Sequence, residues 1–110
     1  MKDLSSKRCI PCEGGVKPFT SSKIKTYLKK LSKGWDEVNG KKIEKRFKFK
    51  DFKEAMKFVN KVAVVAEKEQ HHPDIEISYN KVKITLWTHS IGGLSKNDFI
   101  LASKIDKLQQ

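Results

Sequence analysis

Long hydrophobic runs are missing from this sequence, and their absence limits where the protein can reside. The longest uninterrupted apolar run, at residues 62–66, is five residues long, whereas a helix that spans a bilayer needs about 20. Residues 1–15 contain no hydrophobic stretch followed by a cleavage-like site, so we expect no secretory signal peptide. We therefore expect a cytoplasmic protein without a membrane segment.

Cysteine is scarce as well. The chain contains two cysteines, Cys9 and Cys12, which agrees with a reducing compartment. Their CxxC spacing occurs in redox motifs and in one half of many zinc sites, but the chain has no second pair. An irregular amino-terminal loop is the simplest interpretation, and a zinc ion shared between subunits stays open.

Arginine is the third scarce residue, and this weighs against a nucleic-acid partner. The formal net charge is +11, which by itself suggests such a partner. Of the 24 basic residues, however, only Arg8 and Arg46 are arginine, and the lysines are spread over the whole chain. Direct base recognition relies on the planar arginine fork. We favour a lysine-rich solvated surface, and purely electrostatic phosphate binding stays open.

What the sequence does contain fits one small domain. The chain has 110 residues, of which 37% are hydrophobic, and a chain of this length can bury one modest core. Residues 1–19 show little apolar periodicity and contain two prolines and a pair of glycines, which predicts an irregular lead-in. Residues 20–110 keep regular apolar periods, which exclude wholesale disorder and define the domain.

The first and last helices are predicted from apolar spacing and from residues that cap helix ends. Near the start of the domain, Thr20, Ser21 or Ser22 can cap a helix whose apolar residues continue to Leu31 before Gly34 ends it. Towards the end of the chain, Ser95 and Asp98 form a capping box in front of further apolar residues. The residues that mark this last helix are Phe99, Ala102, Ile105 and Leu108.

The longest predicted helix lies in the middle of the chain. It begins at Asp51 and must end by His72, because Pro73 disfavours helical backbone in the residue before it. Its apolar stripe, which we expect to face the core, comprises Phe52, Ala55, Met56, Val59, Val62, Ala63 and Ala66.

Two hairpins are predicted between the helices. Asn39-Gly40 separates two runs that carry apolar residues, and both residues tolerate positive φ. Residues 75–79 and 82–86 each alternate apolar and polar side chains around a short turn at Asn80-Lys81. The resulting order αββαββα predicts an α+β fold, in which a four-stranded, mainly antiparallel sheet has three helices packed on one face.

All three histidines of the chain flank the second hairpin. His71 and His72 precede its first strand, and His89 follows its second strand. Because the start of one strand of a hairpin lies beside the end of the other, we expect the three imidazoles to converge. Imidazole exchanges protons near neutral pH, so the cluster predicts general acid–base chemistry. The carboxylates of Glu67 and Asp98 are candidates to orient the rings.

A metal site is the competing interpretation of the histidines. Zinc enzymes commonly use three protein ligands, but neighbouring side chains of an extended segment point apart, so His71 and His72 are poorly placed to bind one ion. The helical arrangement of two histidines four residues apart is also absent. We expect no metal, and a metal site and ordinary surface histidines remain as alternatives.

The spacing of these residues resembles the signature of the pterin-4a-carbinolamine dehydratase family. Glu67 stands four residues before the His-His-Pro motif at residues 71–73, and Tyr79 stands six residues after the proline. His89 follows ten residues after Tyr79, and Asp98 follows nine residues later. Several spaced elements in register make this resemblance specific.

The resemblance covers residues 20–108 and implies both a fold and a reaction. The family fold is a four-stranded antiparallel sheet with three helices, assembled as homodimers or homotetramers. The family enzymes are hydro-lyases, 4a-hydroxytetrahydrobiopterin dehydratases, which remove water from a 4a-hydroxytetrahydropterin to give a quinonoid dihydropterin. This step recycles the pterin cofactor of aromatic amino-acid hydroxylases, and it needs no metal or organic cofactor.

The resemblance also implies roles for particular residues. The catalytic residues are His71, His72 and His89, and we expect His72 to be the main acid–base group while the other two hold and polarise the pterin. Glu67 and Asp98 support these side chains. The residues expected to line the substrate are His71, His72, Pro73, Thr88, His89, Ser90 and Ile91.

Three positions depart from the family pattern. Ile75 stands where some relatives have an aromatic residue, and Gln70 stands at a position that is often acidic. Trp87 replaces a smaller residue beside Thr88. Packing or a subunit contact is our preferred interpretation of Trp87, and stacking on a flat pterin is the alternative.

A second function also follows from the resemblance. Some family members bind transcription factors through their helical surface, so a non-enzymatic interaction module is the alternative to an enzyme. In that case partner binding would survive loss of the histidines and would depend on exposed apolar residues of a helix.

Overall fold

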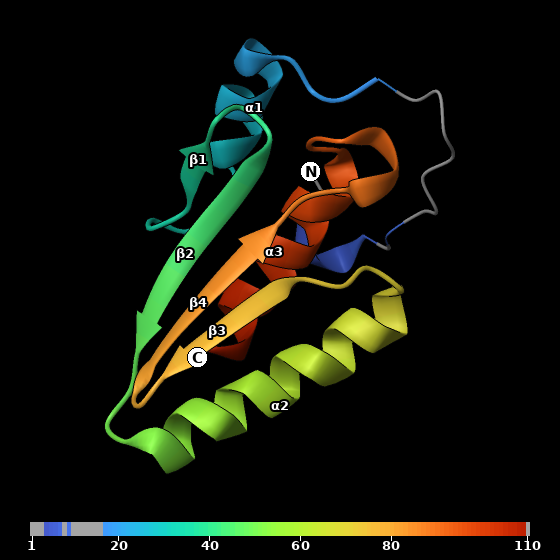
Figure 1. Cartoon of the computed structure of the whole chain (residues 1–110). Helices are drawn as coiled ribbons and strands as arrows, with labels where there is room; N and C mark the ends of the chain where they lie inside the picture. Colours follow the sequence, from blue (N-terminus) through green and yellow to red (C-terminus); the bar gives the residue numbers. More distant parts are fainter. Residues whose placement is uncertain (1–3, 8, 10–16, 110) are drawn as a thin grey trace.

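A four-stranded antiparallel sheet organises the chain (Figure 1). The computed structural model describes residues 4–7, 9 and 17–109. The strands are β1 (Asp36–Val38), β2 (Lys42–Lys48), β3 (Asp74–Ser78) and β4 (Lys81–Leu86), in the spatial order β1-β2-β4-β3. The helices are α1 (Ser21–Leu28), α2 (Phe52–Glu69) and α3 (Lys96–Leu108), with short 3-10 turns η1 (Leu4–Ser6) and η2 (His89–Ile91). These elements confirm the predicted α+β fold and its order αββαββα.

The first hairpin forms at the predicted turn, whereas the second turn lies one residue earlier than predicted. Asn39 and Gly40 both have positive φ, at 53° and 69°, as the Asn-Gly pair indicates. In the second hairpin Tyr79 has a φ of 53°, and Lys81 already belongs to β4. The reason is Asn80, whose side-chain amide donates to the Phe49 carbonyl at 2.9 Å and whose own carbonyl accepts from the Phe49 N–H at 2.8 Å.

Helix α1 is shorter than its apolar spacing indicates. Thr20 caps its start, as predicted, but the helix ends at Leu28. The Leu31 N–H then bonds to the Leu28 carbonyl at 3.1 Å, which is a three-residue turn in place of a helical bond. Beyond it the Ser32 N–H donates to the Asp106 carboxylate of α3 at 3.3 Å, so a tertiary contact draws the chain off the helical path.

Helix α2 begins and ends where the sequence predicts, but it faces the core with a different stripe. Asp51 caps its start, and Gln70 ends it in left-handed backbone with a φ of 54°. Phe58, which the predicted stripe left out, is buried and packs against the rings of Phe47 and Phe49 at centroid distances of 4.7 and 5.0 Å. The residues of α2 that are buried are Ala55, Phe58, Val62 and Ala66. Two members of the predicted stripe, Phe52 and Ala63, are exposed instead.

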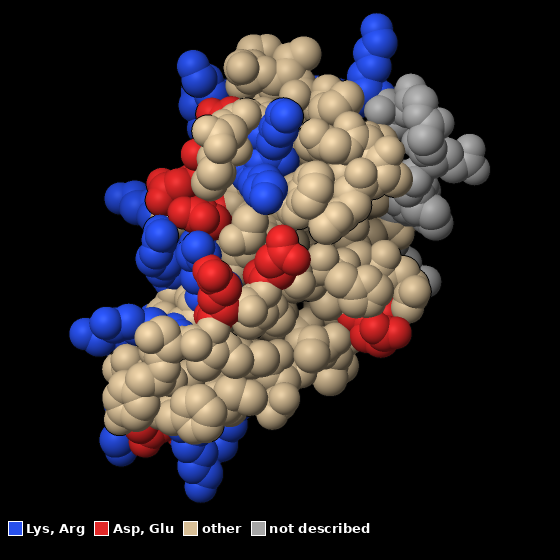
Figure 2. All heavy atoms as spheres, viewed as in Figure 1, with Lys and Arg blue, Asp and Glu red and all other residues tan. Residues whose placement is uncertain are grey.

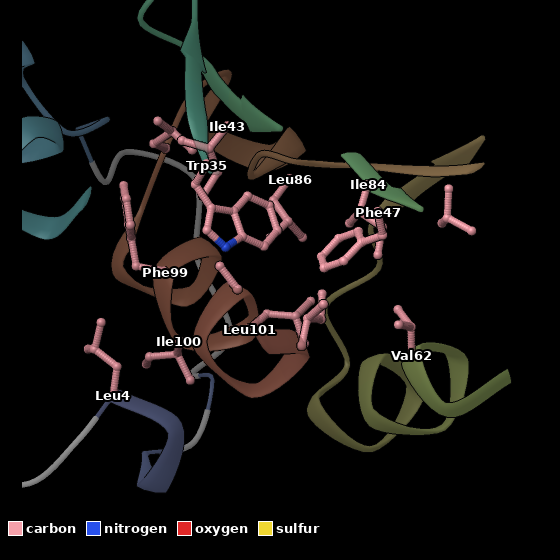
Figure 3. Close-up of a cluster of buried hydrophobic side chains, with 14 of the residues drawn as sticks. Leu4, Trp35, Ile43, Phe47, Val62, Ile84, Leu86, Phe99, Ile100 and Leu101 are labelled. Carbon is pink, nitrogen blue, oxygen red and sulfur yellow. The ribbon is translucent and has the colours of Figure 1, made fainter. Parts of the chain in front are cut away.

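One face of the sheet carries the hydrophobic core (Figure 3). Side chains from β2 and β4 alternate, so that every second residue is buried against the helices and the others are half-buried or exposed. The buried set from these two strands is Ile43, Lys45, Phe47, Val82, Ile84 and Leu86. Helix α3 lies deepest, because nine of its residues are buried. The first turn of α3 is held beside the end of β4, because Asp98 in that turn accepts a hydrogen bond from Thr88.

The described part of the lead-in packs against this core. Leu4 of η1 is only 5% exposed, and the Ser5 carbonyl accepts a hydrogen bond from Lys104 of α3 at 2.8 Å. The domain boundary expected at residue 19 stays a prediction, and Cys12 lies outside the described residues. Over the described part of the chain, no helix combines the length and apolarity needed to cross a bilayer.

Candidate functional site

A largely buried hydrogen bond at the expected site joins His71 to Asp98. His71 follows the left-handed end of α2, and its backbone N–H still bonds to the Ala66 carbonyl at 3.2 Å. Its ring atom Nε2 lies 2.6 Å from Asp98 Oδ1. The His71 side chain is 12% exposed and that of Asp98 is fully buried. Because a carboxylate only accepts hydrogen bonds, Nε2 of His71 carries the proton in this contact.

The capping box at the start of α3 explains why a carboxylate is buried there. The second oxygen of Asp98, Oδ2, accepts from the Ser95 backbone N–H at 2.9 Å and from the Thr88 hydroxyl at 2.8 Å. The hydroxyls of Thr88 and Ser95 lie 2.7 Å apart. Both oxygens are thus bonded, and the helix N-terminus favours their negative charge. The sequence predicted the capping box, but not that Ser95 and Thr88 complete a network with His71.

The segment that carries His89 is closed into a short loop. The Thr88 N–H donates to the Gly93 carbonyl at 2.8 Å, and the Gly93 N–H returns a bond to the Thr88 carbonyl at 3.4 Å. Gly93 must be glycine, because a Cβ there would lie 2.7 Å from Pro18 Cβ. Between these ends η2 presents His89 and Ser90 as exposed residues and Ile91 as a half-buried one.

His72 has a different environment from its neighbour. Its Nε2 lies 2.9 Å from Glu67 Oε2, and the two side chains are 59% and 71% exposed. The hydrogen bond from His72, together with the positive charge of its imidazolium, lowers the pKa of the Glu67 carboxyl. Glu67 stands one helical turn before His71 in the sequence, yet it pairs with His72, because the backbone leaves the helix at Gln70.

The structure brings the two histidine segments together at one end of the β3–β4 hairpin. Asp98 contacts both His71 and Thr88, the residue before His89. Each ring has its own contact: His71 with Asp98, His72 with Glu67, and His89 with the Trp87 indole at a centroid distance of 3.9 Å. The arrangement therefore holds two imidazole–carboxylate pairs and a third imidazole in contact with an indole, which is a set of groups suited to donating and accepting protons.

Cys9 is partly buried, and its environment decides the protonation state of its thiol. Burial, and secondly the negative charge of Glu69, raise the pKa of the Cys9 thiol to about 12, so it is a neutral thiol at physiological pH. A neutral thiol is a poor nucleophile and a poor metal ligand. Within residues 4–7, 9 and 17–109, no group of three His, Cys, Asp or Glu side chains has an arrangement that could hold a metal ion.

Comparison with known proteins gives one consistent family. The family model described as pterin 4 alpha carbinolamine dehydratase matches residues 17–108. The chain is 50% identical over 109 residues to a protein of Alkaliphilus metalliredigens named "Putative pterin-4-alpha-carbinolamine dehydratase", with coverage of 99% of this chain and 98% of that protein. A protein of the same name from Nitrosospira multiformis is 48% identical over 108 residues, with coverage of 98% and 94%.

Solved structures agree with the sequence comparisons. A crystal structure described as a transcriptional coactivator/pterin dehydratase from Brucella melitensis superimposes with a TM-score of 0.80 and 38% identity, and covers 86% of this chain and 100% of that one. A pterin dehydratase-like protein described as a RuBisCO assembly factor in the alpha-carboxysome has a TM-score of 0.59 at 23% identity, over 68% of this chain and 88% of that one. That second likeness concerns the fold alone.

Proposed function

Because this chain belongs to the pterin 4 alpha carbinolamine dehydratase family, we propose that it removes water from a 4a-hydroxytetrahydropterin to give a quinonoid dihydropterin. It is accordingly a hydro-lyase. The family match supports the proposal because it includes every residue of the candidate site. The cellular role that we propose is cytoplasmic recycling of a pterin cofactor after turnover of an aromatic amino-acid hydroxylase.

The proposed reaction requires two proton movements. The bond between C4a and its hydroxyl oxygen breaks, and the hydroxyl takes up a proton because hydroxide is a poor leaving group. A ring nitrogen loses a proton as the new double bond forms, so the net products are the quinonoid dihydropterin and one water molecule. One group must act as an acid and another as a base, and no electron transfer is involved.

The observation that carries this proposal is the pair of consecutive histidines, each bonded to its own carboxylate. The contacts of His71 with Asp98 at 2.6 Å and of His72 with Glu67 at 2.9 Å both use Nε2. In each ring Nδ1 is then the nitrogen that faces the substrate in our proposal, and the carboxylate stabilises the ring when it is charged. The exposed ring, His72, is the main acid–base group in our proposal, because it is accessible to substrate and solvent.

The remaining site residues hold the pterin in this proposal. His71 and His89 orient and polarise the ring system from the two sides of the hairpin end. Glu67 and Asp98 orient the imidazoles without contacting the substrate. The lining segments are residues 71–73 and 88–91, which comprise His71, His72, Pro73, Thr88, His89, Ser90 and Ile91. We propose that neither a metal ion nor an organic cofactor takes part.

The test is a direct assay of 4a-hydroxytetrahydropterin dehydration in the presence of a chelator. The wild-type protein should exceed the spontaneous rate, and His72→Ala should lower kcat by about 10²-fold or more, the usual contribution of a general acid–base group. Glu67→Gln should lower kcat less, since it removes only the partner of His72. Glu54→Gln, which changes an exposed acid elsewhere on α2, is the matched control and should leave the rate unchanged.

Three outcomes would each contradict a part of the proposal. A wild-type rate equal to the spontaneous rate would overturn the enzymatic assignment and favour the non-enzymatic interaction module. A His72→Ala protein with near-full turnover and an unchanged circular dichroism spectrum would overturn the role of His72. Loss of wild-type activity on adding chelator would overturn the metal-free mechanism.

We also propose that the chain forms a homodimer or homotetramer with α2 at the subunit contact. Phe52, Met56, Val59 and Ala63 recur at helical spacing along α2, and none of the four is fully buried. Phe52 is 51% exposed. An apolar helix stripe of this kind is a common contact between identical subunits.

A further inference from the structure

Trp87 stands at the centre of a group of contacts at the end of β4. Its indole lies 3.9 Å from the His89 ring, centroid to centroid, with an angle of 35° between the ring planes. The indole N–H donates to Asp74 Oδ2 at 3.4 Å. The Lys42 ammonium lies 4.7 Å from the indole centroid, within the range of a cation–π contact. The indole thus meets groups from β2, β3 and the loop that follows β4.

The strand register explains why these residues meet. Ile43 pairs with Leu86, so the preceding residue of β2, Lys42, stands opposite Trp87. Asp74 pairs with Thr85 and is therefore the diagonal neighbour of Trp87 on the same face of the sheet. Two neighbouring strands hold the indole from either side, and its position is set by the sheet.

His89 needs an external support that His71 does not need. The His71 side chain is 12% exposed and is fixed by a buried carboxylate. His89 belongs to the exposed turn η2, where an imidazole samples several rotamers unless a neighbour restrains it. The adjacent indole, whose plane is tilted by 35° from that of the imidazole, supplies this restraint, since contacts between aromatic rings are favourable beyond the area that they bury.

We propose that Trp87 is a positioning residue, which holds the His89 imidazole in the orientation in which it meets the substrate. Through Asp74 the same indole connects His89 to the segment that carries His72 and Pro73. The inference rests on the proposed function, because it requires His89 to act on the substrate.

The ring geometry favours this role over direct stacking of Trp87 on the pterin. A flat ring inserted between the indole and the imidazole would need a separation of about 7 Å, twice the usual contact distance between carbon atoms. The observed centroid distance is 3.9 Å. The pterin therefore does not enter between these two rings, and in our proposal it meets the His89 ring from outside the pair while the indole acts through His89.

The experiment combines steady-state kinetics with NMR on four proteins: wild type, Trp87→Ala, His89→Ala and the double variant. Trp87→Ala should lower kcat/KM by roughly three- to tenfold, the range expected for an aromatic pair. In the His89→Ala background the same substitution should have no further effect, because the residue that it positions is absent. Trp87→Phe, which keeps an aromatic ring, should restore most of the activity.

NMR gives a readout that does not depend on turnover. The carbon-bound ring protons of His89 should show a ring-current shift in the wild type, which Trp87→Ala abolishes and Trp87→Phe retains in part. Tyr79→Asn is the matched control, because it removes a ring that is 65% exposed at the opposite end of the hairpin, where Asn tolerates the positive φ. Its kinetics and its His89 signals should match those of the wild type.

The outcomes separate this inference from the proposed function. If His89→Ala is as active as the wild type, the role of His89 in the proposed function fails and the inference fails with it. If His89→Ala is impaired while Trp87→Ala is fully active, only the inference is overturned. The inference is likewise overturned if Trp87→Ala costs the same factor with and without His89, since that result indicates direct substrate contact or a general structural role.

Discussion

The two adjacent histidines show how strongly the surroundings of a residue decide its chemistry. His71 has a buried carboxylate partner in Asp98, and His72 has an exposed partner in Glu67. A buried pair has a fixed geometry and keeps water away, whereas an exposed pair is screened by solvent and can reorganise. In our proposal, this difference gives His71 a fixed position from which it holds and polarises the pterin, and makes the accessible His72 the main acid–base group.

Asp98→Asn should lower both activity and stability. The amide oxygen of the variant is needed in place of Oδ2, which accepts from the Ser95 N–H and the Thr88 hydroxyl, so the amide NH2 donates to His71 Nε2. The proton on this ring then moves to Nδ1, and the atom facing the substrate loses its basic lone pair. We expect kcat to fall by about 10²-fold and the free energy of unfolding to fall by about 1–3 kcal/mol, since bonds to a buried charge are lost. Dehydration kinetics and urea denaturation are the measurements.

The matched control for Asp98→Asn is Asp51→Asn. Asp51 also accepts a hydrogen bond at the start of a helix, from the Glu54 N–H at 2.9 Å, but it lies at the far end of α2 from the histidines. Because Asn caps helices nearly as well as Asp, this variant should keep its activity and most of its stability. Equal losses in the two variants would refute a specific role for Asp98.

Glu67 provides a pH-dependent test of the His72 contact. The hydrogen bond and charge of His72 lower the Glu67 pKa. A carboxyl whose pKa is lower in the folded protein stabilises the fold above its ordinary pKa, and this contribution is lost as the pH falls through the lowered value. In His72→Ala the Glu67 pKa, followed by carboxyl-carbon NMR, should return toward its ordinary value.

Glu76 is the internal control in the same spectra. The hydrogen bond and charge of Lys83 lower its pKa independently of the histidines. Its pKa should therefore remain low in His72→Ala. A Glu67 pKa that is identical in the wild type and the variant would show that the contact does not exist in solution.

At the scale of elements, a buried ion pair ties β2 to α3. Lys45 is the one charged residue on the buried face of β2, and its ammonium lies 2.7 Å from Asp106 Oδ1. The Trp35 indole N–H donates to both oxygens of the same carboxylate, at 3.1 and 3.0 Å. This network fixes the distance between the sheet and α3, and α3 in turn carries Asp98 to the site.

Lys45→Met should destabilise the protein by about 3–5 kcal/mol, because it leaves the Asp106 charge buried without its cation. The double variant Lys45→Met/Asp106→Leu should lose less than the sum of the two single variants. Urea denaturation of the two single variants and the double variant measures these changes in the free energy of unfolding. Lys83→Met is the control, since the Lys83 pair with Glu76 is partly exposed and such pairs contribute about 0–1 kcal/mol. If Lys45→Met lowers the free energy of unfolding no more than Lys83→Met does, the stabilising role of the Lys45–Asp106 ion pair is contradicted.

At the scale of the whole molecule, charge and apolar surface have different distributions. On the face seen in Figure 2, Lys and Arg side chains are scattered and interrupted by Asp and Glu, and do not form one continuous patch. This distribution agrees with the expectation of a solvated lysine-rich surface despite the net charge of +11. The partly exposed apolar stripe of α2, formed by Phe52, Met56, Val59 and Ala63, has a different character. We propose that a second copy of the chain binds this stripe.

Sedimentation velocity should give at least a dimer mass for the wild type, and Met56→Lys should lower that mass because it buries a charge in the contact. Val64→Lys is the matched control. Val64 belongs to the same helix and is 69% exposed, but it lies about a third of a turn away from the stripe. A monomeric wild type, or equal effects of the two substitutions, would contradict the proposed contact.

Much of the fold was predictable because its signals are local. The Asn39-Gly40 turn, the Asp51 cap and the Ser95–Asp98 capping box each depend on residues within one turn of one another, and all are confirmed. The predictions that failed are those that depend on distant partners. The early end of α1 involves Asp106, and the shifted second turn involves Phe49.

The candidate site also has a part that follows from local signals and a part that depends on distant partners. The sequence alone determined that His71, His72 and His89 flank one hairpin, because hairpin pairing follows from alternation and turn residues. Only the tertiary structure decided the partner of each ring: Asp98 for His71, Glu67 for His72 and Trp87 for His89. The physical reason is that backbone periodicity fixes which residues share an element or a hairpin end. The direction of a side chain depends on where α2 unwinds, how deep α3 lies and which strands are neighbours.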